Sequence, residues 1–436
     1  MSAACVARML AVSVLTVLPQ LGMPAAQAVS PPKIDDRRLP TPASPAPPWP
    51  TVQREVCAPT STGAKPERGR LPELADLARI WQLTRGAGQR VAVIDTGVAR
   101  HRRLPNVVPG GDYVSTGDGT QDCDAHGTLV AGIIAAAADS AIDGVGGVAP
   151  EATIVAIRQS SAKFAPAADR WHAGVGDVDT MAKAIRAAAD LGASVINISS
   201  VACVPVTSTL DDRALGAALA YAVDVKNAVV VAAAGNSGGG QCPPQRSDPT
   251  WDNVTVVATP GWYDDYVLTV GSVNSEGTAS PFTLAGPWVD VAATGEAVSS
   301  LESGPISGTS YAAPVVSGLA ALIRARFPAL TARQVMQRIE STAHHPPNRW
   351  DPLVGSGTID ALAAVSTESN PTADTSKPTP IPLPISTPPP AQPSNSRART
   401  TALRGAAIGL VALTVVLATG AATGRLRATR NGVAGD

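Results

Sequence analysis

The chain has 436 residues, of which 44% are hydrophobic, and its formal net charge is −1. This near-neutral charge gives no indication of nucleic-acid binding. The length exceeds what one domain with a large hydrophobic core requires, which leaves room for additional segments at either end.

The first 28 residues are typical of a secretory signal peptide. Arg8 supplies the positive charge, residues 9–21 form the apolar stretch, and Ala26-Gln27-Ala28 fits a cleavage site. An uncleaved membrane anchor is the alternative, but the apolar stretch is short and the cleavage site follows it directly. We therefore expect the rest of the chain to begin outside the cytoplasm.

Residues 29–84 form a proline-rich N-terminal extension. Most of it lacks periodicity, and such a segment cannot bury enough apolar surface to build a core of its own. We expect it to lie along the domain that follows. Its prolines are Pro31, Pro32, Pro40, Pro42, Pro45, Pro47, Pro48 and Pro50.

From residue 89 onward, strand-like and helix-like segments alternate. The expected strands are 91–95, 153–158, 194–199, 229–234 and 267–273, and the expected helices are 127–138, 178–191, 214–226, 310–327 and 332–342. The strand segments are continuously apolar, which is typical of a parallel sheet with helices on both faces. The sequence therefore predicts an α/β domain whose chemistry lies at the carboxyl ends of the strands.

Three chemically active side chains stand at the ends of these elements. Asp95 ends a strand, His126 opens an apolar helix, and Ser310 lies at the start of another. The order Asp, His, Ser is one of the known orders of a serine-hydrolase triad. Taken alone, Ser310 could equally be a helix cap.

The segments around these residues resemble the signatures of subtilisin-like serine proteases. They are IDTGV at 94–98, HGT at 126–128 and SGTSYAAP at 307–314, and AAAGNS at 232–237 is similar to the family's oxyanion segment. The resemblance covers about residues 85–365. It implies that Ser310 is the nucleophile, His126 the base and Asp95 its partner, with Asn236 in the oxyanion hole; Asn236 could otherwise be a turn residue.

The resemblance also implies a pocket for the substrate residue that precedes the cut. Its walls would be Ser199, Ser200 and Val201 on one side and Ala233, Ala234 and Gly235 on the other. Much of the family has Ser-Leu-Gly on the first wall. Because Val201 replaces that glycine, we expect a narrower pocket that favours a small residue.

Four cysteines remain after the signal peptide, which carries Cys5. An even number in an exported protein predicts two disulfides, with three possible pairings, although free buried thiols are the alternative. The resemblance favours Cys203 with Cys242, because both would follow walls of the same pocket. Cys57 would then pair with Cys123 and attach the extension beside His126.

Residues 159–177 form a long segment without clear periodicity, and such loops are usually functional or disordered. This one could lie over the cleft. Arg170, Trp171 and His172 within it are more typical of packing or surface groups than of catalytic ones. The chain shows no dense acidic loop of the kind that binds calcium, so we expect no required metal and no cofactor.

The C-terminal region contains a linker and a hydrophobic segment. Residues 366–403 form a proline-rich linker. Residues 404–425 enclose twenty uncharged residues, enough for a helix of about 30 Å that spans a bilayer. A buried core helix is the poorer alternative. Arginines flank both ends, so the signal peptide sets the orientation and leaves residues 426–436 in the cytoplasm.

This order of segments resembles that of the mycosins, membrane-anchored subtilisin-like proteases linked to type VII secretion. The resemblance implies cleavage of secreted polypeptides and association with the secretion membrane complex. A structural role in that complex, with proteolysis dispensable, is the alternative function. An esterase is disfavoured because Ser310 does not lie in a G-x-S-x-G elbow.

Overall fold

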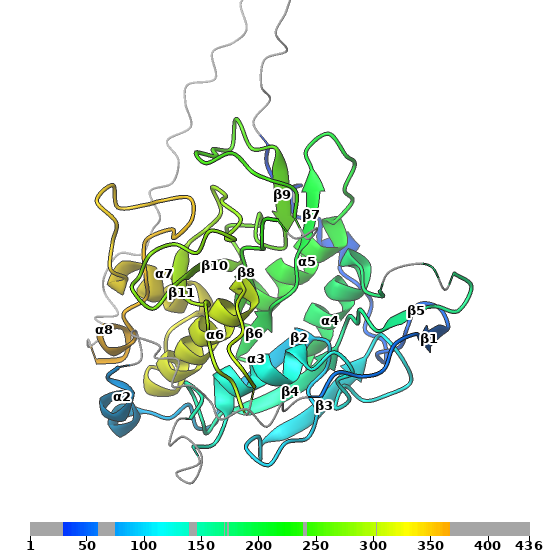
Figure 1. Cartoon of the computed structure of the whole chain (residues 1–436), viewed down its shortest axis with the longest axis horizontal. Coiled ribbons are helices and arrows are strands. Elements are labelled where there is room, and N and C mark those ends of the chain that lie inside the picture. The colour runs from blue at the N-terminus through cyan, green and yellow to red at the C-terminus, as the bar shows by residue number, and fades with distance from the viewer. Residues whose placement is uncertain are drawn as a thin grey trace, which may run out of the picture. The chain divides into compact units, whose positions relative to one another are not determined.

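Seven parallel strands form the central sheet, in the order β11-β10-β8-β6-β2-β4-β3 (Figure 1). The computed structural model describes residues 29–59, 75–138, 146–169, 171, 174–238, 242–301 and 303–366. The strands are β2 (Arg90–Asp95), β3 (Val107–Asp112), β4 (Thr153–Arg158), β6 (Val195–Ile198), β8 (Val229–Ala233), β10 (Leu268–Val273) and β11 (Val291–Thr294).

The strands at the middle of the sheet are mostly apolar, and they are buried along their whole length. Every residue of β6, β8 and β10 is buried, which requires cover on both faces of the sheet. Helices provide it in two groups. One group is α3 (His126–Ala135) with α6 (Thr309–Arg326), and the other is α4 (Val178–Asp190) with α5 (Arg213–Ala220).

Three further helices complete the described part of the chain. Helix α2 (Leu77–Leu83) contacts the last helix, α8 (Ala361–Ser366), and α7 (Ala332–Thr342) packs on both α6 and α8. A 3-10 turn, η2 (Asp36–Arg38), lies in the extension. Helix α5 is shorter than the segment 214–226 predicted, because the chain continues from it as a π-helical turn, η4 (Tyr221–Val225).

The described part of the N-terminal extension, residues 29–59, makes contacts with the domain. Its strand β1 (Thr51–Gln53) pairs antiparallel with β5 (Phe164–Pro166) from the long loop. At its start, the backbone N–H of Val29 donates to the carbonyl oxygen of Trp251 at 2.7 Å. Pairing, hydrogen bonds and a disulfide therefore hold a segment that has no core of its own.

The five predicted strands all lie in the central sheet, but the sequence did not reveal its edges. Strand β3 contains one proline and two glycines, residues that normally argue against a strand. Strand β11 has only four residues. A separate antiparallel pair, β7 (Ala202–Pro205) with β9 (Val256–Thr259), was not predicted either. Pairing with a neighbour, which is a tertiary property, makes these segments strands.

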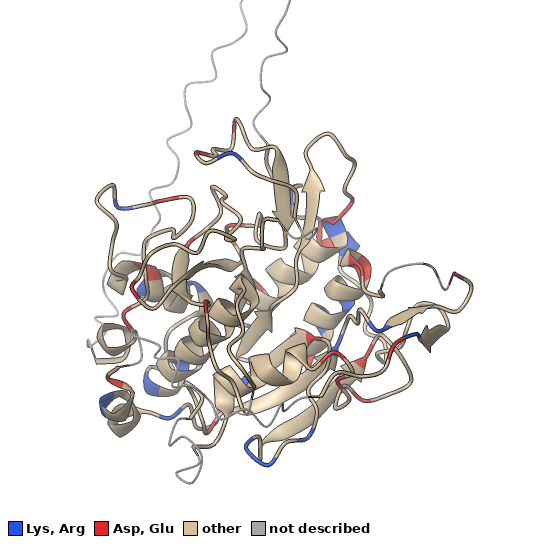
Figure 2. Cartoon of the chain, viewed as in Figure 1, with Lys and Arg blue, Asp and Glu red and all other residues tan. Residues whose placement is uncertain are grey.

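Charged residues lie mainly on helix surfaces and in loops, with acidic and basic side chains interspersed (Figure 2). A few are buried, and three of these end strands of the central sheet: Asp95 on β2, Asp112 on β3 and Arg158 on β4. Arg158 Nη1 lies 3.5 Å from Asp112 Oδ2. These three buried charged residues lie at the carboxyl edge of the sheet, the edge where α/β sheets bind their ligands.

Three predicted segments lie outside the described residues: the signal peptide (1–28), most of the proline-rich linker, and the membrane helix (404–425) with its tail. Within the described part of the chain, no helix combines the length and apolarity that crossing a membrane requires.

Candidate active site

The three predicted catalytic residues stand at the ends of three elements that pack together. Asp95 is the last residue of β2, His126 the first of α3, and Ser310 the second of α6. Helix α6 contacts both α3 and β2. Helices α3 and α6 pack on each other although the candidate residues they carry are 184 positions apart in the sequence (310 minus 126).

The imidazole of His126 is hydrogen-bonded to Asp95. Its Nδ1 lies 2.7 Å from Asp95 Oδ1, which also accepts from the backbone N–H of Thr96 at 2.7 Å. An ionised carboxylate can only accept, so Nδ1 carries the proton and Nε2 is left as the acceptor. Asp95 is 1% exposed, and its Oδ2 accepts no hydrogen bond from the residues that the structure describes. This buried charge is therefore compensated chiefly at Oδ1.

The surroundings of His126 favour its protonated form. Burial is the largest influence and lowers its pKa, but the charge and hydrogen bond of Asp95, together with the charges of Asp122 and Asp124, outweigh it. The pKa of His126 is therefore raised above its ordinary value of 6.5. Such a base holds a proton firmly once it has taken one from a nucleophile.

Ser310 makes its hydrogen bonds with Ser199. The Ser310 hydroxyl donates to the Ser199 carbonyl oxygen at 2.7 Å, and the Ser199 hydroxyl donates to the Ser310 carbonyl oxygen at 2.9 Å. No hydrogen bond joins Ser310 Oγ to His126 Nε2 in the described structure. Catalytic hydrogen bonds are often formed only once substrate is bound. Ser310 would have to turn its hydroxyl away from Ser199 to transfer its proton.

Two hydrogen bonds hold the side chain of Asn236 by its amide oxygen and leave its amide nitrogen available as a donor. Its Oδ1 accepts from the backbone N–H of Thr309 at 2.9 Å and from the Thr309 hydroxyl at 3.1 Å. Because both contacts use the amide oxygen, Nδ2 remains as a donor. Gly308 lies next to it, since a Cβ at that position would be 3.5 Å from Nδ2. The backbone N–H of Ser310, in the first turn of α6, is a second donor without an intrahelical acceptor.

The two predicted pocket walls come into contact with each other. A Cβ placed on Gly235 would lie 3.2 Å from Val201 Cγ2 and 3.3 Å from Cys242 Sγ. The Cys203–Cys242 disulfide joins the segments that follow the two walls, and Cys57–Cys123 forms the other bridge. Both disulfides have the expected pairing. The side chain of Val201 thus lies close to Gly235 on the opposite predicted wall.

Sequence reasoning missed two carboxylates that lie around the imidazole. Asp122 is partly buried and accepts from the hydroxyls of Thr96 at 2.9 Å and Thr128 at 2.6 Å, which joins the end of β2 to the start of α3. Burial raises the pKa of Asp122, against the lowering effect of its bonds with Thr128. Asp124 accepts from the backbone N–H of Ala162 at 2.8 Å. Their positions four and two residues before His126 were the available signal.

Two residues beside Ser310 were also missed, although both stand in the quoted signature. The Thr309 hydroxyl accepts from the Gly235 backbone N–H at 3.2 Å while it contacts Asn236. The ring of Tyr311 packs against His126, with 5.3 Å between the ring centroids. The sequence showed which residues these are, but not what they contact.

The long loop 159–177 is attached at both its start and its middle. Asp124 holds its start, a bridge joins Ser161 to Val175, and β5 pairs with the extension. Trp171 is 95% exposed, as expected for a surface group. Arg170 and His172 lie outside the described residues. The loop is thereby connected to the segment that immediately precedes His126.

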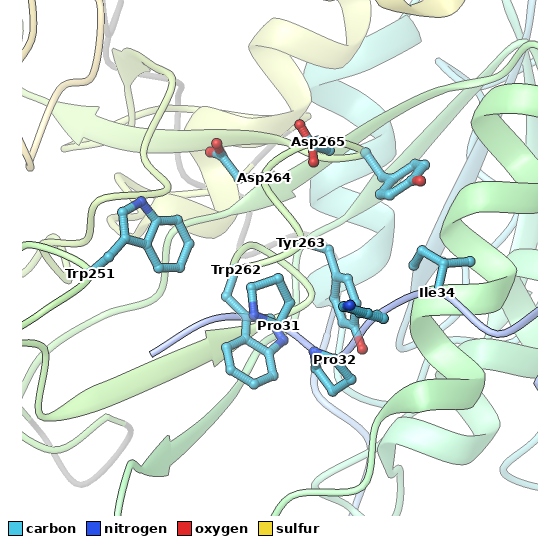
Figure 3. Close-up of a pocket in the computed structure, with 10 residues that line it drawn as sticks. Pro31, Pro32, Ile34, Trp251, Trp262, Tyr263, Asp264 and Asp265 are labelled. Atoms are coloured by element: carbon cyan, nitrogen blue, oxygen red, sulfur yellow. The ribbon is translucent and has the colours of Figure 1, made fainter. Parts of the chain in front are cut away.

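A cavity of about 300 Å³ lies away from these residues, where the extension meets the domain (Figure 3). Pro31 and Pro32 line it beside Trp262 and Tyr263, and the triad residues are not among its lining. Buried Asp212 fixes the two aromatic side chains by accepting from Trp262 Nε1 at 2.8 Å and from the Tyr263 hydroxyl at 2.9 Å. This cavity lies between the extension and the domain and is separate from the candidate active site.

Comparison with known proteins gives consistent matches. The model of the subtilase family matches residues 86–358. Mycosin-4 of Mycobacterium tuberculosis (strain ATCC 25618 / H37Rv) is 67% identical over 98% of each chain, and Mycosin-3 of the same strain is 40% identical over 91% of this chain and 94% of its own.

Two solved structures are similar over the same region. The MycP3 protease from the type VII (ESX-3) secretion system is 44% identical, with a TM-score of 0.71 over 78% of this chain and 100% of its own. A chain of an intact ESX-5 inner membrane complex is 39% identical, with a TM-score of 0.72 over 90% of this chain and 100% of its own.

Proposed function

The chain belongs to the mycosins, within the subtilase family of serine proteases, and from this premise we propose that it is a membrane-anchored endopeptidase whose catalytic residues are Asp95, His126 and Ser310. The observation that carries the assignment is the 2.7 Å contact between His126 Nδ1 and buried Asp95 Oδ1, at the start of a helix that packs against the one bearing Ser310. That contact directs Nε2 toward proton transfer.

The proposed reaction uses the geometry of these side chains directly. Ser310 Oγ leaves the Ser199 carbonyl, attacks the peptide carbonyl carbon and passes its proton to His126 Nε2, which then protonates the leaving amine. Asp95 holds the imidazole and balances its charge. The Asn236 Nδ2 and the Ser310 backbone N–H donate to the oxyanion as it forms. Water then releases the acyl group by the same steps.

A fluorophosphonate probe tests this assignment on the full chain purified in detergent. Such a probe phosphonylates an activated serine with loss of fluoride. We expect label on the peptide that contains Ser310, no label in Ser310→Ala, and normal label in the control Ser208→Ala, which removes an exposed hydroxyl. Label elsewhere, or label that persists in Ser310→Ala, would refute the assignment.

We propose further that the pocket for the residue preceding the cut accepts small side chains. Val201 supports this, because its Cγ2 lies so near Gly235 that a Cβ at that position would be only 3.2 Å away, closer than ordinary van der Waals contact. In a peptide-library digest we expect cuts after alanine, glycine or serine, and a broader range after Val201→Gly. A preference of the unaltered protein for large aromatic residues would contradict the proposal.

The chain's setting is proposed from its end segments and its relatives. We propose cleavage after Ala28, an extracytoplasmic catalytic domain, a span at 404–425 and a cytoplasmic tail. A related chain of 39% identity is part of an ESX-5 inner membrane complex, which supports association of this chain with a type VII secretion complex. Its substrates would then be secreted polypeptides.

A structural role in that complex is the second candidate, favoured by the same relative. Ser310→Ala separates the two roles. If secretion continues while cleavage is lost, the chain also supports the complex independently of proteolysis. If secretion stops although the complex is intact, proteolysis is the required activity.

A further inference from the structure

The aromatic ring of Tyr311 lies against the imidazole of His126. Their ring centroids are 5.3 Å apart and the ring planes are inclined by 44°. Tyr311 directly follows Ser310 in the first turn of α6, and its side chain is partly buried. A Cβ on Gly308 would lie 3.7 Å from Tyr311 Cδ2 and 3.5 Å from Asn236 Nδ2. The ring therefore touches the base and borders the proposed oxyanion donors.

This ring contact joins the turn that bears the nucleophile to the base. Asp95 holds Nδ1 from one side, but no hydrogen bond between Ser310 and His126 is present among the described residues. An imidazole tied at one nitrogen can still tilt about that bond. The Tyr311 ring limits this motion from the side of α6, because it moves with the helix that bears Ser310.

The attraction between the Tyr311 ring and the imidazole becomes stronger when the imidazole is charged. A cation within about 6 Å of an aromatic centroid is attracted by the ring's quadrupole. The interaction strengthens in the transition state, when His126 holds the proton of Ser310, so it lowers the barrier rather than merely tightening binding. We propose that Tyr311 is a positioning residue that keeps the His126 imidazole facing Ser310 and stabilises its protonated form.

The groups that face His126 decide whether its neutral or its protonated form is favoured. Asp95 at the end of β2 and Asp122 and Asp124 in the segment before α3 favour the imidazolium, and burial opposes it. From α6 the facing group is Tyr311, whose pKa burial raises to about 12. The phenol is therefore neutral at working pH, and the ring acts through its π-electrons rather than as a charge.

Deuterium exchange at the imidazole C2 carbon, followed by mass spectrometry, measures the pKa of each histidine separately. It does not require activity, so it tests this inference even if the proposed function fails. The variants are Tyr311→Phe, which keeps the ring, and Tyr311→Leu, which keeps apolar volume and cover over the imidazole without π-electrons. His101 and His344 serve as internal references in the same full-length protein.

We expect the pKa of His126 to fall in Tyr311→Leu and to stay unchanged in Tyr311→Phe, while the two reference histidines do not move. The rate of labelling by a fluorophosphonate probe should fall by about 3- to 30-fold in Tyr311→Leu and be retained in Tyr311→Phe. Tyr266→Leu, a change of a partly buried tyrosine away from His126, should leave the rate unaltered.

An unchanged pKa of His126 in Tyr311→Leu would overturn the proposal, as would an equal loss of rate in Tyr311→Phe. Failure of the unaltered protein to label would instead count against the proposed function alone. The pKa measurement on the same samples would then still decide the role of Tyr311.

Discussion

At the scale of single residues, the candidate site depends on groups that hold other groups in place. Thr309 is fully buried and directs the amide of Asn236, while partly buried Asp122 joins the end of β2 to the start of α3. These contacts fix a donor or an acceptor before substrate arrives, which is how a preorganised site lowers its barrier. The hydroxyl of Ser310 is different, because it donates to the Ser199 carbonyl oxygen and must leave that acceptor to react.

Thr309→Val removes one hydroxyl and keeps the shape of the side chain. It leaves the Gly235 N–H without its acceptor and releases one of two contacts on Asn236 Oδ1. We expect kcat to fall about 10-fold with little change in KM, since an unsatisfied buried group costs about 1–3 kcal/mol. Asn236→Ala should lower kcat further, by about 10²- to 10³-fold, which is the magnitude measured for the matching donor of a subtilisin. Equal losses in both variants would contradict this order.

The pH dependence of probe labelling should follow His126. The neutral imidazole is the active base, so the rate should rise with pH, with a midpoint above 6.5 because the pKa of His126 is raised. Asp124→Asn should lower that midpoint, and Asp118→Asn, a control, should not. By linkage, the same raised pKa stabilises the fold fully below 6.5, and this contribution is lost as pH rises through the folded value. A midpoint below 6.5 would contradict the prediction.

At the scale of elements, the extension is attached to the segments that position His126. The Cys57–Cys123 bridge ends three residues before His126, and β1 pairs with β5 of a loop whose start is bonded to Asp124. Phe164 on β5 packs under the guanidinium of buried Arg158, with 4.5 Å from Cζ to the ring centroid. The described part of the extension is thus joined to the segments around His126 but contributes none of the proposed catalytic residues.

Removal of the first disulfide should weaken both the fold and the site. The bridge joins residues 66 positions apart, and Cys203–Cys242 joins residues 39 apart, so the chain-entropy model assigns each about 4 kcal/mol. We expect Cys57→Ala/Cys123→Ala to lose about 2–4 kcal/mol of unfolding free energy and to label more slowly. The measurements are denaturant unfolding and probe rate.

The matched control is Cys203→Ala/Cys242→Ala, which removes the bridge behind the pocket. This control should lose a similar amount of unfolding free energy, but it should also change which residues are preferred before the cut. If both double variants changed labelling and preference alike, the two bridges would not have the separate roles inferred from their positions.

At the scale of the whole molecule, the described chain from the extension through α8 contains every residue of the proposed site. The proposed signal peptide, most of the linker and the proposed span lie outside it. Their proposed role is to export the protein and attach it to the membrane. The uncharged segment 405–424 is long enough for the hydrocarbon core, and no acidic or basic residue interrupts it. Location and chemistry are therefore expected to be separable.

Truncation after residue 366 tests this separation. We expect the truncated chain to leave the membrane fraction and to keep its probe labelling, because the segment that favours the bilayer is gone. Deletion of residues 431–436, the matched control, should leave the protein in the membrane fraction. A truncated chain that remains membrane-bound after a carbonate wash would contradict the proposed anchor.

The sequence by itself determined the parallel α/β core, because continuous apolar strands such as 229–234 can be satisfied only by cover on both faces. It also determined the candidates Asp95, His126 and Ser310, since helix starts and strand ends are local features. Only the tertiary structure decided that β3 and β11 complete the sheet, that Tyr311 packs on His126, and that Ser199 holds Ser310. Those are contacts between distant segments, and they depend on how the elements pack, which no local pattern records.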